Sequence, residues 1–500
     1  MFDHSFVPLS QNDAPALLAP GRATATHGAL RDLVTQSAGR LADLGLSGRV
    51  IALMLPNGPE MAVAFLAASH VGCAAPLNPA YGPEDLRFYL ADLGAAALIC
   101  ADGAAGPARA VAKDLGVQVI ALRPLLDAVA GGFTLHPERA GRLRADLRRA
   151  GDHAVMLHTS GTTARPKLVG LARDQLRHSI GAIAASLAFA PQDRGLCVMP
   201  LFHIHGLMAG LCAPLAAGGS VVCTPGFDGL AFFRHLAEFR PSWYSAVPSM
   251  HRAILARAPR NGDITAQSRL RFVRSSSAAL PLGVSQALQQ LFGCPVIEAY
   301  GMTEAAHQIC TNGLDAGGRR AGSVGRPGAA FVTILDPQGQ KLGPDICGEI
   351  ALRGPGIHGG YVDNPDANAA AFTDGWFRTG DEGRLSADGF LTITGRLKEI
   401  INRGGEKISP LEIDNILADH PDVLEAVAFA IPHAALGEDL ALALVPQPGA
   451  ALDPIDIRRW LGARVAEFKV PRQIRILDSI PKGATGKVQR LALARQLGFT

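Results

Sequence analysis

The segment LHTSGTTARPKLV, residues 157–169, gathers four hydroxyl side chains and a glycine between two apolar runs, and a lysine follows closely. The apolar runs, Ala154–Leu157 and Leu168–Leu171, predict two strands joined by this loop. Small hydroxyls and backbone amides beside a lysine suit a polyphosphate, because they combine many short donors with a positive charge. We therefore expect a phosphate site made of Thr159, Ser160, Gly161, Thr162, Thr163 and Lys167.

This loop differs from the phosphate-binding loop of P-loop NTPases. That loop has a second glycine directly before its lysine and a serine or threonine directly after it. Here Pro166 precedes Lys167 and Leu168 follows it. The sequence therefore disfavours a P-loop NTPase. Taken without the other segments, the hydroxyl cluster is also compatible with an ordinary Ser/Thr turn that binds no phosphate.

Length and composition indicate a globular protein of several domains. The chain has 500 residues, of which 48% are hydrophobic and 18% charged, and its formal charge is +3. So small a net charge argues against nucleic acid or a membrane surface as a partner. The eight cysteines form no CxxC pair, and we see neither a signal peptide nor an apolar run of membrane-spanning length. We expect a cytoplasmic protein without stable membrane association, as a monomer or a homodimer.

Strand-like and helical segments alternate through most of the chain, which predicts an α/β fold with largely parallel, layered sheets. Examples are a helix over 26–45, a strand over 49–58 and a helix over 174–189. From about residue 330, short alternating segments with glycine turns predict a small antiparallel, barrel-like β unit. We expect a large domain over 1–395, a connection at 396–399 and a small α+β domain over 400–500.

Six further segments follow the hydroxyl loop in an order that is typical of one family. They are MPLFHIHGL (199–207), SSSAALP (275–281), EAYGMTEA (298–305), GWFRTGDEG (375–383), GRLKEIINRGGEKISP (395–410) and PKGATGKVQR (481–490). Together they resemble the adenylate-forming superfamily of acyl-CoA synthetases, luciferases and peptide-synthetase adenylation domains. Its usual loop is TSGTTGxPKGV, so Ala164 and Leu168 replace two glycines here.

The resemblance implies a two-step reaction that uses ATP, Mg²⁺ and coenzyme A. A carboxylate attacks the α-phosphate of ATP, which gives an acyl adenylate and pyrophosphate, and a thiol then displaces AMP. Such reactions depend mainly on positioned donors and cations. The catalytic groups implied are Lys487, Thr303, Glu304 as the metal ligand, and His203 at the acyl pocket.

The resemblance also implies the residues that bind the nucleotide and coenzyme A. Tyr300 offers a flat face to adenine, Asp381 accepts the ribose hydroxyls with help from Arg396, and Lys398 lies at a hinge about which the small domain rotates. The remaining positions are Ser277 and Ala278 beside adenine, Ala299 and Gly301 next to the tyrosine, and Gly404 and Gly405 at the pantetheine tunnel.

The acid itself is suggested by polar residues at the expected acyl pocket. In an extended segment His203 and His205 point the same way, and His307 shares a helical face with Glu304. With Ser276 and Ser277, three imidazoles predict a small, polar, partly cationic pocket, whereas a long acyl chain needs an apolar one.

Within the superfamily these segments look most like oxalate–CoA ligases. Malonate-activating relatives usually carry arginine where this chain has Ala299. We therefore expect a very small acid, oxalate first. A ligase for a short or medium aliphatic or aromatic acid stays open, as does an adenylation enzyme that loads a carrier protein. A luciferase-like oxygenase is not excluded by the motifs, but no segment suggests a luciferin site.

Overall fold

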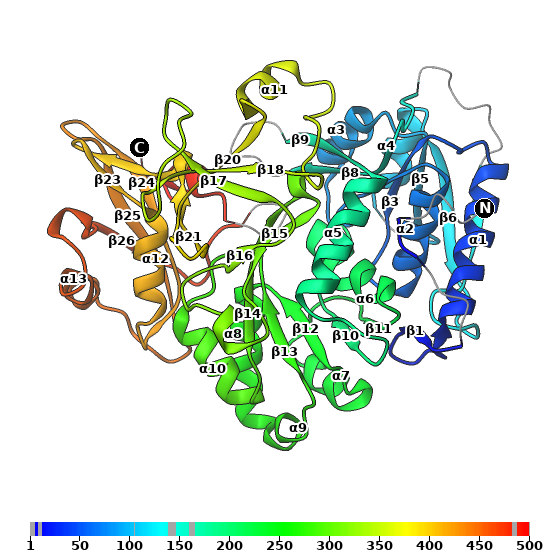
Figure 1. The fold of residues 1–500 in the computed structure, drawn as a ribbon, viewed down its shortest axis with the longest axis horizontal. Coiled ribbons are helices and arrows are strands. Elements are labelled where there is room, and N and C mark those ends of the chain that lie inside the picture. The colour runs from blue at the N-terminus through cyan, green and yellow to red at the C-terminus, as the bar shows by residue number, and fades with distance from the viewer. Residues whose placement is uncertain are drawn as a thin grey trace.

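The computed structural model describes residues 6–8, 13–104, 106–138, 147–159, 166–482 and 488–499. Two large, mainly parallel sheets, a small antiparallel sheet and a C-terminal sheet make up this part of the chain (Figure 1). The expected α/β layering and the antiparallel region after residue 330 are thus confirmed. None of the helices in the described ranges combines the length and the apolar character that a membrane span requires.

The first large sheet has seven strands and carries the hydroxyl loop at one edge. Its inner strands are parallel, and the two edge strands run antiparallel to their neighbours. In sheet order the strands are β7 (Phe133–Pro137), β6 (Gln118–Pro124), β5 (Ala97–Ala101), β3 (Val50–Met54), β4 (Cys73–Pro76), β8 (His153–Thr159) and β9 (Lys167–Ala172).

The second large sheet has nine strands and ends in an antiparallel hairpin that bears the YGMTE segment. In sheet order the strands are β16 (Arg326–Pro327), β15 (His307–Thr311), β14 (Val296–Met302), β13 (Phe272–Ser275), β12 (Trp243–Ala246), β10 (Arg194–Cys197), β11 (Ser220–Cys223), β1 (Pro15–Leu18) and β2 (Ala25–Thr26).

Helices between and outside the two large sheets form the core. One hydrophobic cluster joins the facing sides of both sheets through three helices, and two more clusters cover the outer sides. The inner helices are α1 (His27–Asp43), α2 (Pro59–Val71) and α5 (Arg173–Ser186); the outer ones include α3 (Pro83–Leu93), α4 (Ala108–Asp114), α7 (Ala231–Phe239), α8 (Pro248–Arg257) and α10 (Leu282–Phe292), and the short α6 (Ala213–Ala216) and α9 (Gly262–Ala266) complete this region.

The boundaries of these helices follow from local sequence, as α1 illustrates. The hydroxyl of Thr26 accepts a hydrogen bond of 3.1 Å from the amide of Ala29, which satisfies one of the free N–H groups at the start of the helix. Gly45, with a φ of 78°, follows the last turn and allows the chain to reverse. The predicted helices over 26–45 and 174–189 are therefore confirmed to within a few residues.

The antiparallel sheet after residue 330 holds the GWFRTGDEG segment. Its strands are β17 (Phe331–Leu335), β18 (Gly348–Arg353), β19 (Phe372–Thr373), β20 (Trp376–Leu385) and β21 (Leu391–Arg396), and α11 (Pro365–Ala371) precedes β19.

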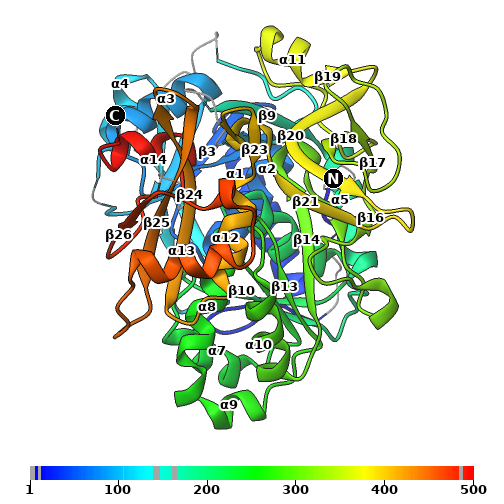
Figure 2. The same cartoon turned by 90° about the vertical axis from the view of Figure 1, so that its left-hand side faces the viewer.

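The C-terminal sheet forms the side of the molecule that faces the viewer in Figure 2. It comprises β22 (Ile401–Arg403), β23 (Glu406–Ile408), β24 (Val423–His433), β25 (Gly437–Pro446) and β26 (Gln473–Ile476), with α12 (Pro410–Ala418), α13 (Pro454–Gly462) and α14 (Arg490–Gln496). Its core consists of two hydrophobic clusters separate from those of the large sheets. Arg252 of α8 contacts this region by donating to the carbonyl of Leu424 at 2.7 Å.

Candidate active site

The two ends of the hydroxyl loop are held next to each other by strand pairing. Thr159 at the end of β8 lies opposite Lys167 at the start of β9, and its hydroxyl donates to the Lys167 carbonyl at 3.5 Å. The candidate residues Ser160, Gly161, Thr162 and Thr163 lie outside the described residues. The ammonium of Lys167 lies 4.3 Å from the ring centre of Tyr361. Burial and the nearby charge of Lys398 lower the pKa of Lys167, while Glu304 opposes them.

Tyr361 contacts Glu304 as well as Lys167. Glu304 is buried in a 3₁₀ turn over Thr303–Ala305. The Tyr361 hydroxyl donates to Oε1 of Glu304 at 3.2 Å, and burial raises the pKa of this carboxyl. The described residues contain no group of three or more His, Cys, Asp or Glu side chains that could enclose a metal ion. A single buried carboxylate close to Lys167 does fit Mg²⁺, which commonly takes its other ligands from substrate phosphates and water.

Asp381 is held by two side chains from neighbouring segments. Tyr300 at the end of β14 donates its hydroxyl to Oδ2 at 2.5 Å, and Nε of Arg396 lies 2.9 Å from Oδ1. Asp381 and Arg396 are directly opposite each other in the β20–β21 pairing. Burial and the adjacent carboxylate raise the pKa of Tyr300, and Asp381 raises the pKa of Arg396. The carboxylate is therefore fixed in place by a hydrogen bond and an ion pair from two different segments.

The segment beside the expected adenine site joins β13 to β14. Ser277 and Ala278 are exposed just after β13, whereas Ser276 is buried and its hydroxyl donates to the carbonyl of Ala299 at 2.9 Å. Gly301 has a steric requirement, since a Cβ atom there would lie 1.9 Å from the carbonyl oxygen of His307.

Two of the three expected pocket histidines, His205 and His307, lie side by side, but the backbone conformation at each differs from the one predicted. His205 and His307 stack with ring centres 4.9 Å apart and an interplanar angle of 16°. His203 is half-buried, and its ring lies 4.6 Å from that of Phe202 at an interplanar angle of 53°, so it does not join the stack. The extended segment predicted for 203–205 is wrong, because Ile204 and His205 are helical and lead into a π-helix over Gly206–Cys212.

The prediction that His307 shares a helical face with Glu304 is also wrong. Ala306, with a φ of 49°, ends the turn, and His307, with a φ of 100°, begins β15. Ser277 also has a positive φ, of 73°. Left-handed backbone at non-glycine residues carries strain of about 1–3 kcal/mol each, and such strain tends to accumulate at functional sites.

The charge of this pocket comes from a residue that the sequence interpretation missed. Burial holds the pKa of His205 and of His307 well below the ordinary histidine value, so both rings are neutral. The cation is Arg274 of β13, which is 0% exposed. One nitrogen of its guanidinium lies 3.2 Å from Nε2 of His205, and the other lies 3.2 Å from Nε2 of His307. An arginine inside the apolar strand RFVRS was the available signal.

The small C-terminal region carries the remaining candidates. Lys398 is exposed in the turn over Leu397–Glu399, and Gly404 and Gly405, with φ of 61° and 97°, form the turn between β22 and β23. Lys487 lies outside the described residues.

Arg490 ties the chain just after Lys487 to two other segments. Its Nε lies 3.0 Å from a carboxylate oxygen of Glu399, and its Nη2 lies 2.7 Å from one of Asp414.

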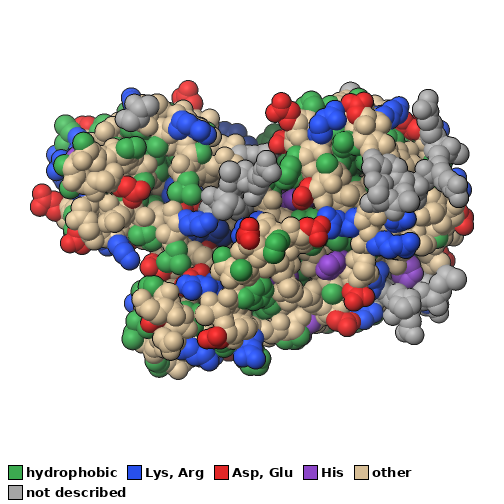
Figure 3. Space-filling model, turned by 90° about the horizontal axis from the view of Figure 1, so that it is seen from above, with side chains coloured by type: hydrophobic (Ala, Val, Ile, Leu, Met, Phe, Trp, Pro, Cys, Tyr) green, Lys and Arg blue, Asp and Glu red, His purple; other side chains and the backbone are tan. Residues whose placement is uncertain are grey.

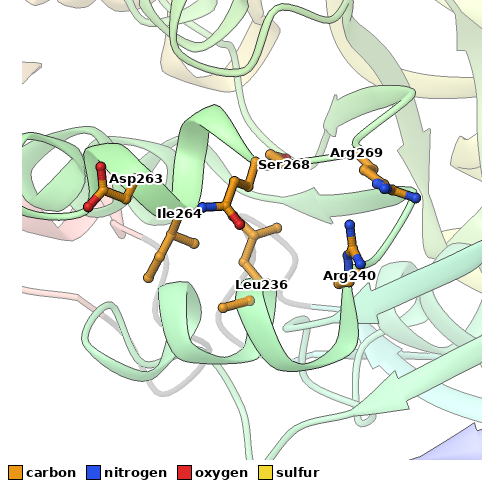
Figure 4. Close-up of a pocket in the computed structure, with 8 residues that line it drawn as sticks. Leu236, Arg240, Asp263, Ile264, Ser268 and Arg269 are labelled. Carbon is orange, nitrogen blue, oxygen red and sulfur yellow. The ribbon is translucent and has the colours of Figure 1, made fainter.

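Two surface features lie outside these groups. Seen from above, basic and acidic side chains are interspersed rather than gathered (Figure 3). A small hollow between α7 and α9, lined by Leu236, Arg240, Asp263 and Ile264 among others, opens at the far end of the molecule from β20 (Figures 1 and 4). It brings together none of the candidate residues.

Comparison with known families agrees with this arrangement. Residues 8–362 match the AMP-binding enzyme domain, and residues 412–487 match the AMP-binding enzyme C-terminal domain. The chain belongs to the AMP-binding enzyme family. It is an AMP-forming acid–thiol ligase that uses ATP, Mg²⁺ and coenzyme A.

Individual members of the AMP-binding enzyme family are similar over nearly the whole chain. An oxalate–CoA ligase of Arabidopsis thaliana is 40% identical, and the match spans 97% of this chain and 95% of that ligase. An oxalate–CoA ligase of Saccharomyces cerevisiae is 36% identical, with 89% and 86% covered. The o-succinylbenzoate CoA synthetase of Bacillus subtilis, solved with its acyl-adenylate intermediate, superposes with a TM-score of 0.82 at 27% identity, covering 96% and 94%. Formation of an acyl adenylate followed by a thioester is the reaction of this family.

Proposed function

We propose that this ligase activates a very small acid, oxalate first, and transfers it to coenzyme A. The observation that carries this proposal is the pair of stacked imidazoles, His205 and His307, with the hydroxyl of Ser277 3.0 Å from Nδ1 of His205. Polar donors of this kind suit an acid without an aliphatic tail. Two relatives that are named oxalate–CoA ligases, at 40% and 36% identity, support the same assignment.

In this proposal the large lobe binds ATP through the residues already described. Thr159, Lys167 and the loop between them bind the β- and γ-phosphates, and Thr303 contacts the α-phosphate. Glu304 holds Mg²⁺, which neutralises charge on the phosphates when it is bound. Asp381 and Arg396 bind the ribose, and the ring of Tyr300 lies against adenine, flanked by Ser277, Ala278, Ala299 and Gly301.

The smaller lobe supplies the cation for the first step and the thiol channel for the second. Lys487 balances the charge that builds up when the carboxylate attacks the α-phosphate. We place the lobe boundary at 396–399, with Lys398 in the hinge, and assign Gly404 and Gly405 to the pantetheine channel. Seven of the eight cysteines are buried, and all eight are free, which is consistent with a reducing cytoplasm. We place the enzyme there, as a monomer or a homodimer.

A panel of acids tests the proposed substrate. Pyrophosphate release is measured with ATP and Mg²⁺ for oxalate, malonate, acetate, octanoate and coumarate, and kcat/KM is compared. We expect oxalate to give the highest value. A higher value for octanoate or coumarate would refute the small polar pocket, and a strict requirement for a carrier protein in place of coenzyme A would refute the acceptor.

A further inference from the structure

Arg274 is a fully buried cation that no carboxylate neutralises. Its guanidinium contacts two histidines, Ser245 at 3.3 Å and Gln308 at 3.2 Å, and no acidic side chain among the described residues. Arg403, which is also buried, lies 2.6 Å from Asp439 and illustrates the usual pairing. Burial lowers the pKa of Arg274 to about 9, and no acidic group contributes to that shift. The guanidinium therefore stays charged at neutral pH, in an interior that offers it no counter-ion.

The hydrogen bonds of Arg274 determine which nitrogen of each neighbouring imidazole carries the proton. A guanidinium can only donate, and Nε2 of His307 faces it at 3.2 Å. Nε2 of His205 lies 3.2 Å from the guanidinium and 2.7 Å from the hydroxyl of Ser245, which can itself donate. A proton-free Nε2 on each ring suits these contacts and avoids directing an N–H at the cation. Both rings are neutral, so in each the proton resides on Nδ1. Nδ1 of His205 lies 3.0 Å from the hydroxyl of Ser277, and it therefore donates to that oxygen.

The two Nδ1 atoms lie on the side of each ring away from the guanidinium. Ser277, which receives the proton of His205, is exposed. Nδ1 of His307 lies 3.2 Å from the point where a Cβ of Gly301 would stand, next to Tyr300. It has no acceptor within the described part of the chain. His205 thus lies between the buried guanidinium and the exposed Ser277, and each imidazole carries its donor on the side away from Arg274.

We propose that Arg274 is a positioning residue that selects acids carrying a second anionic group. It orients His205 and His307 so that their Nδ1–H groups, one directly and one through Ser277, meet the distal carboxylate, and its unbalanced charge attracts that carboxylate through the rings. The proposal rests on the proposed function, since it explains how a pocket for oxalate discriminates by charge. The carboxylate that reacts with ATP is not part of this contact.

The decisive experiment compares oxalate with oxamate, in which a neutral amide replaces the distal carboxylate. Pyrophosphate release by the full-length enzyme gives kcat and KM for each acid in the wild type, Arg274→Met and Arg274→Lys. We expect the wild type to prefer oxalate by roughly 100-fold in kcat/KM, as charge-assisted hydrogen bonds imply. Arg274→Met should raise KM for oxalate and change oxamate by less than about 3-fold, so that the preference nearly disappears. Arg274→Lys should restore part of it.

Arg271→Met is the matched control, because Arg271 precedes the same strand but pairs with Asp193 at 2.8 Å. It should leave the preference unchanged whatever it does to stability. An unchanged oxalate-to-oxamate ratio in Arg274→Met, or equal losses for both acids in the folded Met and Lys variants, would overturn the role of Arg274. A wild type that prefers acetate or octanoate to oxalate would instead refute the proposed substrate, so the two failures are distinguishable.

Discussion

The hydroxyl of Tyr300 donates to Oδ2 of Asp381 across 2.5 Å, which joins the end of β14 to β20. Arg396 occupies the other carboxylate oxygen at 2.9 Å. A carboxylate oxygen has two lone pairs, so a group of this kind suits a contact with several hydroxyls, such as those of a ribose. Two protein partners thus aim the carboxylate before the nucleotide binds, which reduces the ordering that binding requires.

Asp381→Asn should weaken ATP binding, because it removes the charge from both ribose contacts. We expect KM for ATP to rise roughly 100-fold, and roughly 10-fold for Tyr300→Phe, which removes only the group that aims the carboxylate. Initial rates of pyrophosphate release against ATP concentration measure both. An Asp381→Asn enzyme with the wild-type KM for ATP would remove the ribose assignment.

Lys487→Ala should impair the first half-reaction selectively. The loss of a cation aimed at the developing charge should lower adenylation by at least ~100-fold. Thioester formation from preformed acyl adenylate should persist. Lys482→Ala serves as the control, since Lys482 pairs with Glu425 at 3.1 Å and should have little effect. Similar losses in both half-reactions would contradict the assignment.

Arg490→Ala should reduce adenylation without affecting the affinity for ATP. Arg490 lies three residues after Lys487 and pairs with Asp414 and Glu399, so it is a fixed point close to the lysine in the chain. We expect kcat for pyrophosphate release to fall roughly 10-fold, with KM for ATP unchanged. Arg490→Lys, which keeps the charge but not the two-pronged geometry, should be intermediate. A rise in KM alone would point to another role.

Gly405→Leu should slow thioester formation more than adenylation, because a side chain there would obstruct the proposed pantetheine channel. Gly449→Leu is a matched control. Both glycines have a positive φ, 97° and 83°, and open space where a Cβ would stand, so the backbone strain is comparable. Transfer from preformed acyl adenylate to coenzyme A measures the effect. Equal behaviour of the two variants would place the channel elsewhere.

Glu298 should make the fold sensitive to pH. Burial raises the pKa of this carboxyl from 4.5 to about 7, so the folded state binds a proton more tightly than the unfolded state. Its contribution to stability is present below pH 4.5 and is lost as the pH rises through 7. Glu298→Gln should therefore match the wild type near pH 4.5 and exceed its Tm by about 2–4 °C at pH 8. The exposed Glu238→Gln should show no such trend.

The sequence predicted the grouping of residues at the proposed nucleotide site better than the backbone of the proposed acyl pocket. Lys167, Glu304 and Asp381 lie in segments whose glycine and hydroxyl spacing is visible in one dimension, and strand ends bring them together. His205 depends on a π-helix, which has no periodic signature in sequence and forms only through packing. The relation of His307 to Glu304 failed because the positive φ of Ala306 is set by the tertiary structure, not by the residue.

Arg274 was missed for a different physical reason. An arginine is normally assigned to the surface, and only the apolar neighbours Phe272 and Val273 hint that this one lies in a buried strand. The role proposed for Arg274 rests on its lack of a carboxylate partner among the described residues, and only three-dimensional contacts reveal this.

The buried guanidinium of Arg274 also links the stability of the folded enzyme to the concentration of its substrate acid. An interior cation without a counter-ion makes the empty fold less stable than an apolar replacement of the same shape would be. An anion that binds only the folded state adds stability in proportion to the logarithm of its concentration. The folded enzyme would therefore be least stable in cells that contain little of the acid. In cells that contain much of it, the bound acid would stabilise the folded state.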